Sequence, residues 1–317
     1  MRHTVLAGGV GAARYLQGAI EAFDPADVTA VVNVADDVTL HGLRVCPDLD
    51  TCTYTLANAI DPQRGWGLVN ESFNAMATLG RYGGIDWFSL GDQDLGTHLY
   101  RTQRLTEGAT LTEVTAEISA AWGIEATLLP VSDDPIETRV TRAGGEEIGF
   151  QEYFVRLAHN VEISSVRFVG LEQARPTAAV IQAIESAETL VIAPSNPIVS
   201  IQPVLCVPGI ESAVRARRAQ NVAVSPIVGG QALKGPADRM LRELGEQATV
   251  VGIARRYRDL AATLVIDEVD SEFADEIEDQ GMRVIAVPTI MSEPAVARAL
   301  AETCHQAGQA GQAGASP

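Results

Sequence analysis

The segment HTVLAGGVGAAR, residues 3–14, decides the fold that we expect for this chain. An apolar strand, His3–Ala7, leads into a glycine loop, and a helix follows to about Phe23. This arrangement exposes backbone N–H groups at a helix N-terminus, where phosphates bind, so Gly9 and Gly11 are candidate substrate-binding residues. Arg14 stands where the GxGxxG pattern of dinucleotide-binding folds has its third glycine. Its side chain could reach a phosphate directly or lie idle in solvent.

A second informative segment, NVADDVTLHGLRVCPDLDTCTYT at residues 33–55, follows the apolar run Val28–Val34. The run predicts a buried strand, and open α/β sheets bind their ligands at the C-terminal edge of such strands. Four carboxylates follow the run: Asp36, Asp37, Asp48 and Asp50. Without a cation or hydrogen-bond donors they would repel one another, and Mg2+ prefers oxygen ligands of this kind. All four are candidate metal ligands, and Asn33 is a candidate substrate-binding residue.

Asp37 and Asp50 are the principal catalytic candidates, binding Mg2+ directly or through water, with Asp36 and Asp48 behind them. One of the four carboxylates could also accept the proton of an attacking hydroxyl. The structural alternative is an Asx turn at the first acidic pair and a helix cap at the second. An NAD-dependent dehydrogenase would use Asp36 to hold a ribose, but ribose recognition needs only one carboxylate, and Arg14 breaks the glycine pattern.

Composition restricts the class of protein. The length of 317 residues predicts about two domains or one large α/β unit. Asp and Glu outnumber Lys and Arg 41 to 23, and the resulting charge of −18 opposes binding to nucleic acid or to an anionic membrane. An anionic substrate must therefore be received by local donors or by a metal. The four cysteines form no CxxC pair, and no apolar run has membrane-spanning length, so we expect a cytoplasmic protein.

Alternating strands and helices predict an α/β fold with a Rossmann-like, doubly wound and mostly parallel sheet. Residues 1–60 and 166–304 would form this core, and residues 61–165, which carry all three tryptophans, a smaller and mainly helical insertion. The low-complexity tail 305–317 is expected to be disordered. The strands expected after the insertion begin at 189, 222, 248, 263 and 283. The expected helices lie at 51–60, 72–81, 97–104, 112–122, 211–219 and 237–244, with another from Pro176. The segments 86–90, 128–131, 150–157 and 164–169 are expected to be strands.

Three polar loops follow predicted strands and supply further candidates. The loop GDQDLGTH, residues 91–98, contains Asp92, Gln93 and His98, which could face a ligand or form a long helix cap. PSNP at 194–197 provides Ser195 and Asn196, which could donate to a nucleotide or cap a turn. GGQALKGP at 229–236 provides Lys234, which could meet a phosphate or be an ordinary surface lysine. SDDP at 132–135 has the composition of a turn.

A set of motifs resembles one family along nearly the whole chain except the tail: AGGVGAAR, NVADD, HGLRVCPDLDTCTYTL, RGWG, LGDQDLGTH, PVSDDP, FQEYFV, APSNPIVSI and SPIVGGQALKGPADRML. It is the 2-phospho-L-lactate transferase and phosphoenolpyruvate transferase family of coenzyme F-420 biosynthesis. The form HGLRVCPDLDTC resembles the actinobacterial branch, whose members are phosphoenolpyruvate transferases.

The resemblance implies a Mg2+-dependent, homodimeric transferase with a Rossmann-like core. Its acceptor would be the ribityl hydroxyl of the deazaflavin Fo, and its donor a guanosine diphosphate carrying phosphoenolpyruvate or phospholactate. The hydroxyl attacks the phosphorus nearer the three-carbon acid, and GMP leaves. The family's deazaflavin contacts carry over onto Asp50 and onto residue 93, where Gln93 replaces the usual arginine of GDRD. The neutral Gln93 changes the character of that contact.

A binding protein without catalysis is the main alternative. A related family with a similar glycine loop binds nucleotide sugars and acts as a regulator. Its members are not expected to keep PDLDT, GDxD and SPxxGG together, and this chain has all three. The sequence leaves open which three-carbon acid is transferred and which aspartate holds the metal.

Overall fold

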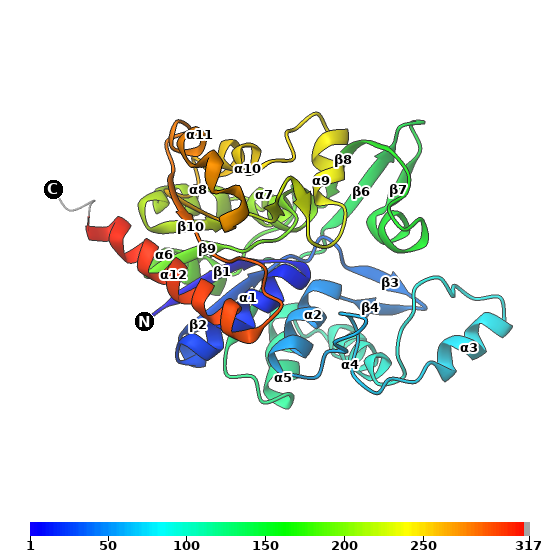
Figure 1. Ribbon diagram of the computed structural model, residues 1–317. Helices are drawn as coiled ribbons and strands as arrows, with labels where there is room; N and C mark the ends of the chain where they lie inside the picture. The colour runs from blue at the N-terminus through cyan, green and yellow to red at the C-terminus, as the bar shows by residue number, and fades with distance from the viewer. Residues whose placement is uncertain (314–317) are drawn as a thin grey trace.

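The computed structural model describes residues 1–313 and places seven parallel strands in one sheet. In chain order the strands are β1 (His3–Ala7), β2 (Val28–Val32), β5 (Thr127–Pro130), β9 (Thr189–Ile192), β10 (Asn221–Val224), β13 (Thr263–Ile266) and β14 (Arg283–Ala286). Their order across the sheet is β14-β13-β10-β9-β1-β2-β5, and Figure 1 shows β10, β9, β1 and β2 in this spatial order. Strands β2 and β5 therefore lie on one side of β1, and the later strands lie on the other side. The expected Rossmann-like α/β fold is confirmed, and its order reverses between β1 and β9, where such folds bind ligands.

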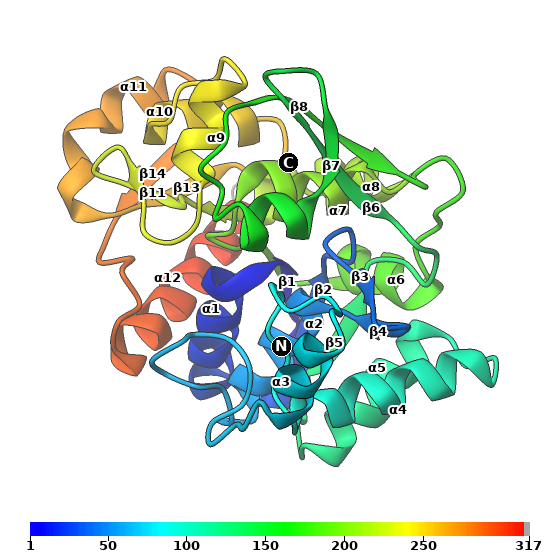
Figure 2. The ribbon, with the colours of Figure 1, turned by 90° about the vertical axis from the view of Figure 1, so that its right-hand side faces the viewer.

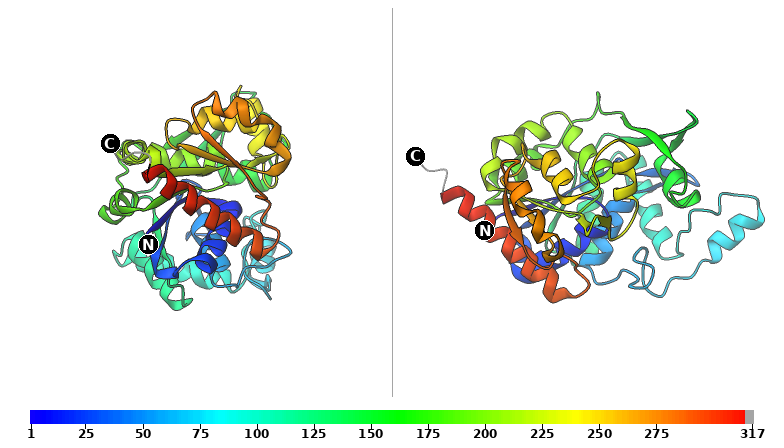
Figure 3. Two further views of the ribbon diagram at one scale, coloured as in Figure 1. Left: turned by 60° about the vertical axis from the view of Figure 1, so that its left-hand side comes forward. Right: turned by 45° about the horizontal axis from the view of Figure 1, so that its top comes forward.

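Helix α1 (Gly9–Ala22) packs between α2 (Pro47–Leu56) and α12 (Pro294–Ala313), as Figure 1 and the left panel of Figure 3 show. Its buried stripe consists mainly of small residues, so a neighbouring helix can come close. A Cβ added at Gly18 would lie 2.2 Å from the carbonyl carbon of Ala297. Only glycine allows α1 and α12 this approach.

The expectation of a disordered tail from residue 305 is wrong for residues 305–313, which continue α12. His305 and Ala307 are buried there, and a Cβ at Gly311 would lie 1.8 Å from the carbonyl oxygen of Ala219. The small residues of the QAG repeat thus let the helix pack closely on the sheet domain. Residues 314–317 of the expected tail lie outside the described residues.

The segment 61–165 is less separate from the core than we expected, because its strand β5 forms the edge of the main sheet beside β2. Helices α3 (Asn74–Arg81), α4 (Asp94–Thr106) and α5 (Leu111–Ala121) precede it. After it, β6 (Glu137–Arg142), β7 (Glu147–Gly149) and β8 (Ile163–Val169) form a small antiparallel sheet. Figure 1 and the right panel of Figure 3 show α3 standing out from the body of the molecule.

Several expected elements take another form. Residues 86–90 form no strand, residues 152–156 form a helical turn, and residues 164–169 pair in the small sheet. The apolar run at 248–253 belongs to helix α10 (Val250–Tyr257), because the Thr249 hydroxyl accepts from the Gly252 N–H and starts a helix. Helix α5 starts at Leu111, after its cap Thr110, and not at residue 112, and α6 (Ala178–Ser186) starts after its cap Thr177 and not at Pro176.

Helix α2 begins at Pro47, so the acidic residues of PDLD lie within its first turn instead of capping it from outside.

Within residues 1–313 no single helix is long and apolar enough to cross a membrane; the bent pair 197–206 and 210–216 has the required length and composition only when taken together.

Candidate active site

The candidate site lies at the point where β1 and β9 end. The glycine-rich first turn of α1, which follows β1, is so close to the chain after β9 that a Cβ at Gly11 would lie 2.2 Å from the carbonyl oxygen of Pro194. Gly9 adopts φ +69°, which favours glycine. A Cβ at Gly8 would lie 2.9 Å from Asp48 Oδ2, and the Gly9 N–H donates to the Asp48 carboxylate. Asp48 therefore lies directly against the loop at the start of α1.

Asn33 holds Asp48 in this position. Its Nδ2 donates to Asp48 Oδ2 at 2.9 Å and to the Val199 carbonyl at 3.3 Å, and its Oδ1 accepts from the Ala35 N–H. The side chain is completely buried and its polar atoms are engaged within the protein. Asn33, which we expected to contact substrate, thus positions a carboxylate.

The carboxylates of Asp36, Asp37 and Asp48 are buried close to one another. Asp36 accepts from the Thr138 hydroxyl at 3.1 Å. Asp37 Oδ2 accepts from Arg44 at 2.8 Å and from the Cys46 thiol at 3.0 Å, whereas Asp37 Oδ1 is buried without a hydrogen-bond partner.

Burial raises the pKa of each of these three carboxyls. The pKa of Asp48 rises to about 6, with a further upward contribution from Asp37. The pKa of Asp37 also rises to about 6, although the Arg44 guanidinium opposes the shift. Burial and the neighbouring Asp48 raise the pKa of Asp36 well above its usual range. Because Arg44 pairs with only one of the three, the group has more negative charge than the nearby protein cations offset.

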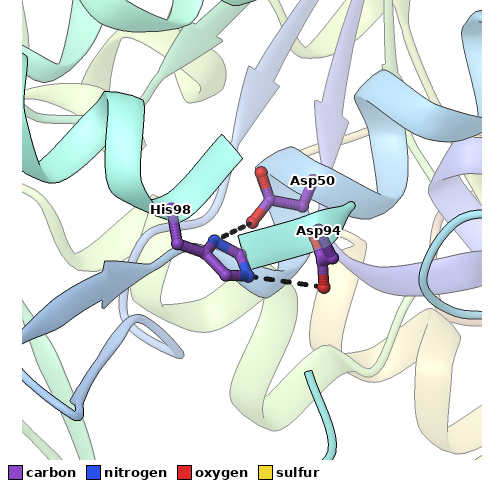
Figure 4. A group of neighbouring side chains, drawn as sticks. All are labelled: Asp50, Asp94 and His98. Atoms are coloured by element: carbon purple, nitrogen blue, oxygen red, sulfur yellow. Dashed lines mark ion pairs between the residues drawn. The ribbon is translucent and has the colours of Figure 1, made fainter. Parts of the chain in front are cut away.

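Asp50 belongs to a second buried network, in which Arg101 is the cation. Figure 4 shows three other members of this network, Asp50, Asp94 and His98. The Arg101 guanidinium forms a two-point ion pair with its carboxylate, and His98 Nδ1 lies 3.7 Å from Asp50 Oδ2. On the other side of the imidazole, His98 Nε2 lies 3.3 Å from Asp94 Oδ2. Tyr54 donates to Asp94 at 2.6 Å. The atoms of Asp50, Asp94 and His98 are close enough to share a metal, but Arg101 already supplies a positive charge to Asp50.

Asp92 and Gln93 organise the backbone at the base of α3. Asp92 accepts from the Ser72 hydroxyl at 2.6 Å and from the N–H groups of Asn74 and Ala75, and these donors lower its pKa to about 2. Gln93 Nε2 donates to the Asn70 carbonyl at 3.2 Å. The cap that we considered as the alternative is therefore present at Asp92.

At the end of β9, Asn196 Oδ1 caps a helical turn by accepting from Ile198 and Val199 N–H groups. Ser195 differs from it, because the Ser195 hydroxyl is buried and has no hydrogen-bond partner. A buried hydroxyl without a partner is uncommon, and this one lies at the switch point of the sheet. Ser195 is therefore the better placed of the two to meet a ligand.

Arg14 and Lys234 come together near the glycine loop. Partial burial and the neighbouring Arg14 charge lower the pKa of Lys234. Lys234 Nζ lies 2.9 Å from the position of a Cβ on Gly65, and Arg14 donates to the Met291 carbonyl at 3.3 Å. Two cations near enough for one to lower the pKa of the other favour an anion in their neighbourhood.

The sequence analysis missed Arg44, Arg101 and Thr138, which contact the predicted aspartates. It also missed Asp94 and its partner Tyr54. A pattern in the sequence could have identified Arg101. With Asp94 and His98 it forms a polar stripe at helical spacing on α4, and all three side chains are buried. Thr138 had none, because it lies 102 positions from Asp36.

Comparison with known proteins gives one consistent result. The family model described as 2-phospho-L-lactate transferase CofD matches residues 4–297. A phosphoenolpyruvate transferase of Mycobacterium avium is 44% identical over 320 residues, covering 93% of this chain and 95% of the relative. One from Streptomyces griseus is 44% identical over 306 residues, covering 95% and 96%. One from Mycobacterium tuberculosis is 43% identical over 328 residues, covering 97% and 99%.

Among solved structures, a member of the UPF0052 family from Bacillus halodurans superimposes with a TM-score of 0.62. It is 16% identical and covers 96% of this chain and 98% of its own. This likeness concerns the fold alone.

Proposed function

The chain belongs to the 2-phospho-L-lactate transferase CofD family, and from this membership we propose that it transfers a phosphoenolpyruvyl group to the deazaflavin Fo. The donor consists of phosphoenolpyruvate joined to GMP, so that the two phosphates form a guanosine diphosphate. The products are GMP and the phosphodiester dehydro form of coenzyme F-420-0. Phosphoenolpyruvate is favoured over phospholactate because relatives at 43–44% identity are phosphoenolpyruvate transferases.

The observation that carries the proposal is the group of buried carboxylates beside a glycine loop at the sheet's switch point. Phosphoryl transfer requires positioning and charge neutralisation more than covalent help from the protein. Arg14 and Lys234 supply positive charge for the donor's diphosphate. The unpartnered Ser195 hydroxyl supplies a donor close to the same loop.

The residues fit the Mg2+ that the family resemblance implies. Asp36 and Asp48 are both buried, and the charge of Asp48 opposes ionisation of Asp36. Both side chains offer oxygen atoms, which are the ligands that a hard cation prefers. We assign the ion to these two residues, with Asp37 nearby. When bound, Mg2+ neutralises charge on the carboxylates and on the donor's phosphates. Asp50, which we expected among the ligands, is neutralised by Arg101 and is assigned to contact with the acceptor.

In the proposed reaction the terminal ribityl hydroxyl of Fo attacks the phosphorus that bears the enolpyruvyl group. The new oxygen–phosphorus bond replaces the bridging bond to GMP, which leaves with its electron pair. We assign the hydroxyl proton to Asp37 Oδ1, which is buried without a partner. A carboxylate whose pKa is raised to about 6 is well suited to accept a proton near neutral pH. We also propose that the chain acts as a homodimer, as members of the family do.

The test is binding of Fo, followed by its fluorescence, with and without Mg2+ and GMP. We expect saturable binding that an Asp50→Asn variant weakens by about tenfold, since this change removes a charged contact. The matched control is Asp24→Asn, which alters a surface cap remote from the site. Absence of Fo binding together with tight binding of a nucleotide sugar would refute the transferase and favour a regulator.

A further inference from the structure

Lys234, to which we assign the donor's phosphates, lies in a short link between two elements of the fold. Residues 233–236 connect strand β12 (Gln231–Ala232) to helix α9 (Ala237–Glu243). Within residues 1–313 no backbone–backbone hydrogen bond involves Lys234 or Gly235, and the neighbouring Leu233 is exposed. The position of the Lys234 ammonium group therefore depends on what holds the two ends of the link.

A tight hairpin lies at the first end of the link. Strand β11 (Ile227–Val228) pairs antiparallel with β12 through a two-residue turn, in which Gly229 has φ +57° and Gly230 has φ +75°. Two positive φ angles in succession are typical of a type I′ turn, which glycine forms without strain. Figure 2 shows β11 on the same side of the molecule as α9, above α1. The geometry of this turn therefore sets the course of the chain toward Lys234.

Asp270 holds the turn from inside the protein. It lies in the short helical segment 268–273 that follows β13, and it is only 3% exposed. The Gly229 N–H donates to both oxygens of its carboxylate, at 3.0 and 3.2 Å. A hydrogen bond that a carboxylate accepts from a backbone N–H is stronger than one between neutral groups. Asp270 therefore ties the turn to the end of β13.

Arg242 holds the same turn from the outside. Its guanidinium donates to the Gly230 carbonyl at 3.1 Å and pairs with Asp238 at 2.9 Å, while its side chain remains largely exposed. Because Arg242 belongs to α9, this contact joins the two elements at the ends of the link. The segment that carries Lys234 is thus a small loop whose ends are fixed by two side chains.

We propose that Asp270 is a positioning residue for Lys234: by fixing the turn at residues 229–230 it holds the ammonium group near Arg14, where we assign the donor's phosphates. Arg242 is the second tether. The inference rests on the proposed function and deepens it. Asp270 is buried against the turn, so it acts through Lys234 and not on the substrate. Without Asp270 the ligand itself must order the loop, and the free energy of ordering is subtracted from the free energy of binding.

Calorimetry of GMP binding in low salt measures the effect. We expect Asp270→Ala to weaken GMP binding about fivefold, less than the loss of Lys234 itself, and to leave Fo binding unchanged. Asp270→Asn keeps an oxygen that can accept from the Gly229 N–H, so it should bind GMP within about twofold of the wild-type protein. The matched control is Asp133→Ala, because the Asp133 carboxylate accepts from the Thr112 N–H at 2.7 Å beside the edge strand β5, far from β13. This control should bind GMP as the wild-type protein does.

A double variant distinguishes positioning of Lys234 from a general effect on the fold. In the Lys234→Ala background, Asp270→Ala should weaken GMP binding further by less than about twofold, because the side chain that it positions is already absent. A purely structural role would give the same loss in both backgrounds. That result, or wild-type GMP affinity in the Asp270→Ala protein, would overturn the assignment.

Arg242→Ala tests the same loop if Asp270→Ala does not fold, because Arg242 is exposed and its loss leaves no cavity. We expect about a threefold loss of GMP affinity that disappears in the Lys234→Ala background. Arg215→Ala, which removes an exposed arginine from an ion pair on α8 (Ile210–Ala216), is the control for the loss of positive charge. A loss that persists without Lys234, or that is equal in Arg215→Ala, would refute the tether. If the wild-type protein bound no GMP at all, the proposed function itself would fail, which is a different result.

Discussion

Replacing Asp48 with asparagine is expected to stabilise the metal-free protein at neutral pH while it removes activity. Asp48 is buried against the glycine loop, and its pKa rises from the usual 3.8 to about 6. The ionised form is therefore less favourable in the folded chain than in the unfolded one. This shift corresponds to a destabilisation on the order of 3 kcal/mol once Asp48 is ionised.

The sign follows from the two pKa values. Because the folded-state pKa is the higher one, the penalty is absent below about pH 4 and complete above about pH 6. Asparagine keeps an oxygen that can accept from Asn33 and has no charge to bury. We expect Asp48→Asn to raise the free energy of unfolding by about 1–3 kcal/mol at pH 7.5 and by almost nothing at pH 4.

Urea unfolding in EDTA, followed by tryptophan fluorescence at both pH values, measures this difference. Asp92→Asn is the contrasting control, because hydrogen bonds from the start of α3 lower the pKa of Asp92, so its loss should destabilise at neutral pH. A destabilised Asp48→Asn protein at pH 7.5, or an equal gain at pH 4, would show that the site does not hold an uncompensated charge.

Three further predictions concern other parts of the chain. Lys234→Ala should weaken GMP binding by about tenfold in low salt and leave Fo binding intact; calorimetry that shows unchanged GMP affinity would exclude Lys234 from the phosphate site. Arg101→Met leaves Asp50 as a buried charge without its cation and should lower the free energy of urea unfolding by about 3–5 kcal/mol. Adding Asp50→Asn should restore part of this loss. If the losses of the two single variants simply added in the double variant, the pairing would be contradicted. Gly311→Val should detach the end of α12 and speed hydrogen exchange at residues 305–311, so unchanged exchange would contradict the close packing on the sheet domain.

The parts of the fold that were predictable are those set by local pattern. Local pattern was enough for the strand and helix start at residues 3–14, and for the strands that begin at 189 and 263. In each case the apolar run is short and its boundaries are clear. The run at 248–253 misled, because valines favour strands while the Thr249 cap favours a helix, and the cap prevailed. The QAG repeat misled for a related reason, since small residues are typical both of disordered tails and of closely packed helices.

The site was predictable as a cluster but not in its internal arrangement. The sequence places Asp36, Asp37, Asp48 and Asp50 in one segment, and all four are buried in the structure. Which charges they meet depends on long-range contacts: Arg101 reaches Asp50 across 51 positions, and Thr138 reaches Asp36 across 102. Asp50 is thus neutralised by Arg101, whereas Asp36, Asp37 and Asp48 have only Arg44 among them, a division that spacing along the chain does not contain.

The most direct test of the transferase is to count GMP released against Fo consumed in a reaction with the phosphoenolpyruvyl donor and Mg2+. The proposed reaction predicts one GMP for each Fo converted to the phosphodiester, no release without Fo, and no release in EDTA. GMP release that proceeds at the same rate without Fo, or conversion of Fo that is unaffected by EDTA, would contradict it.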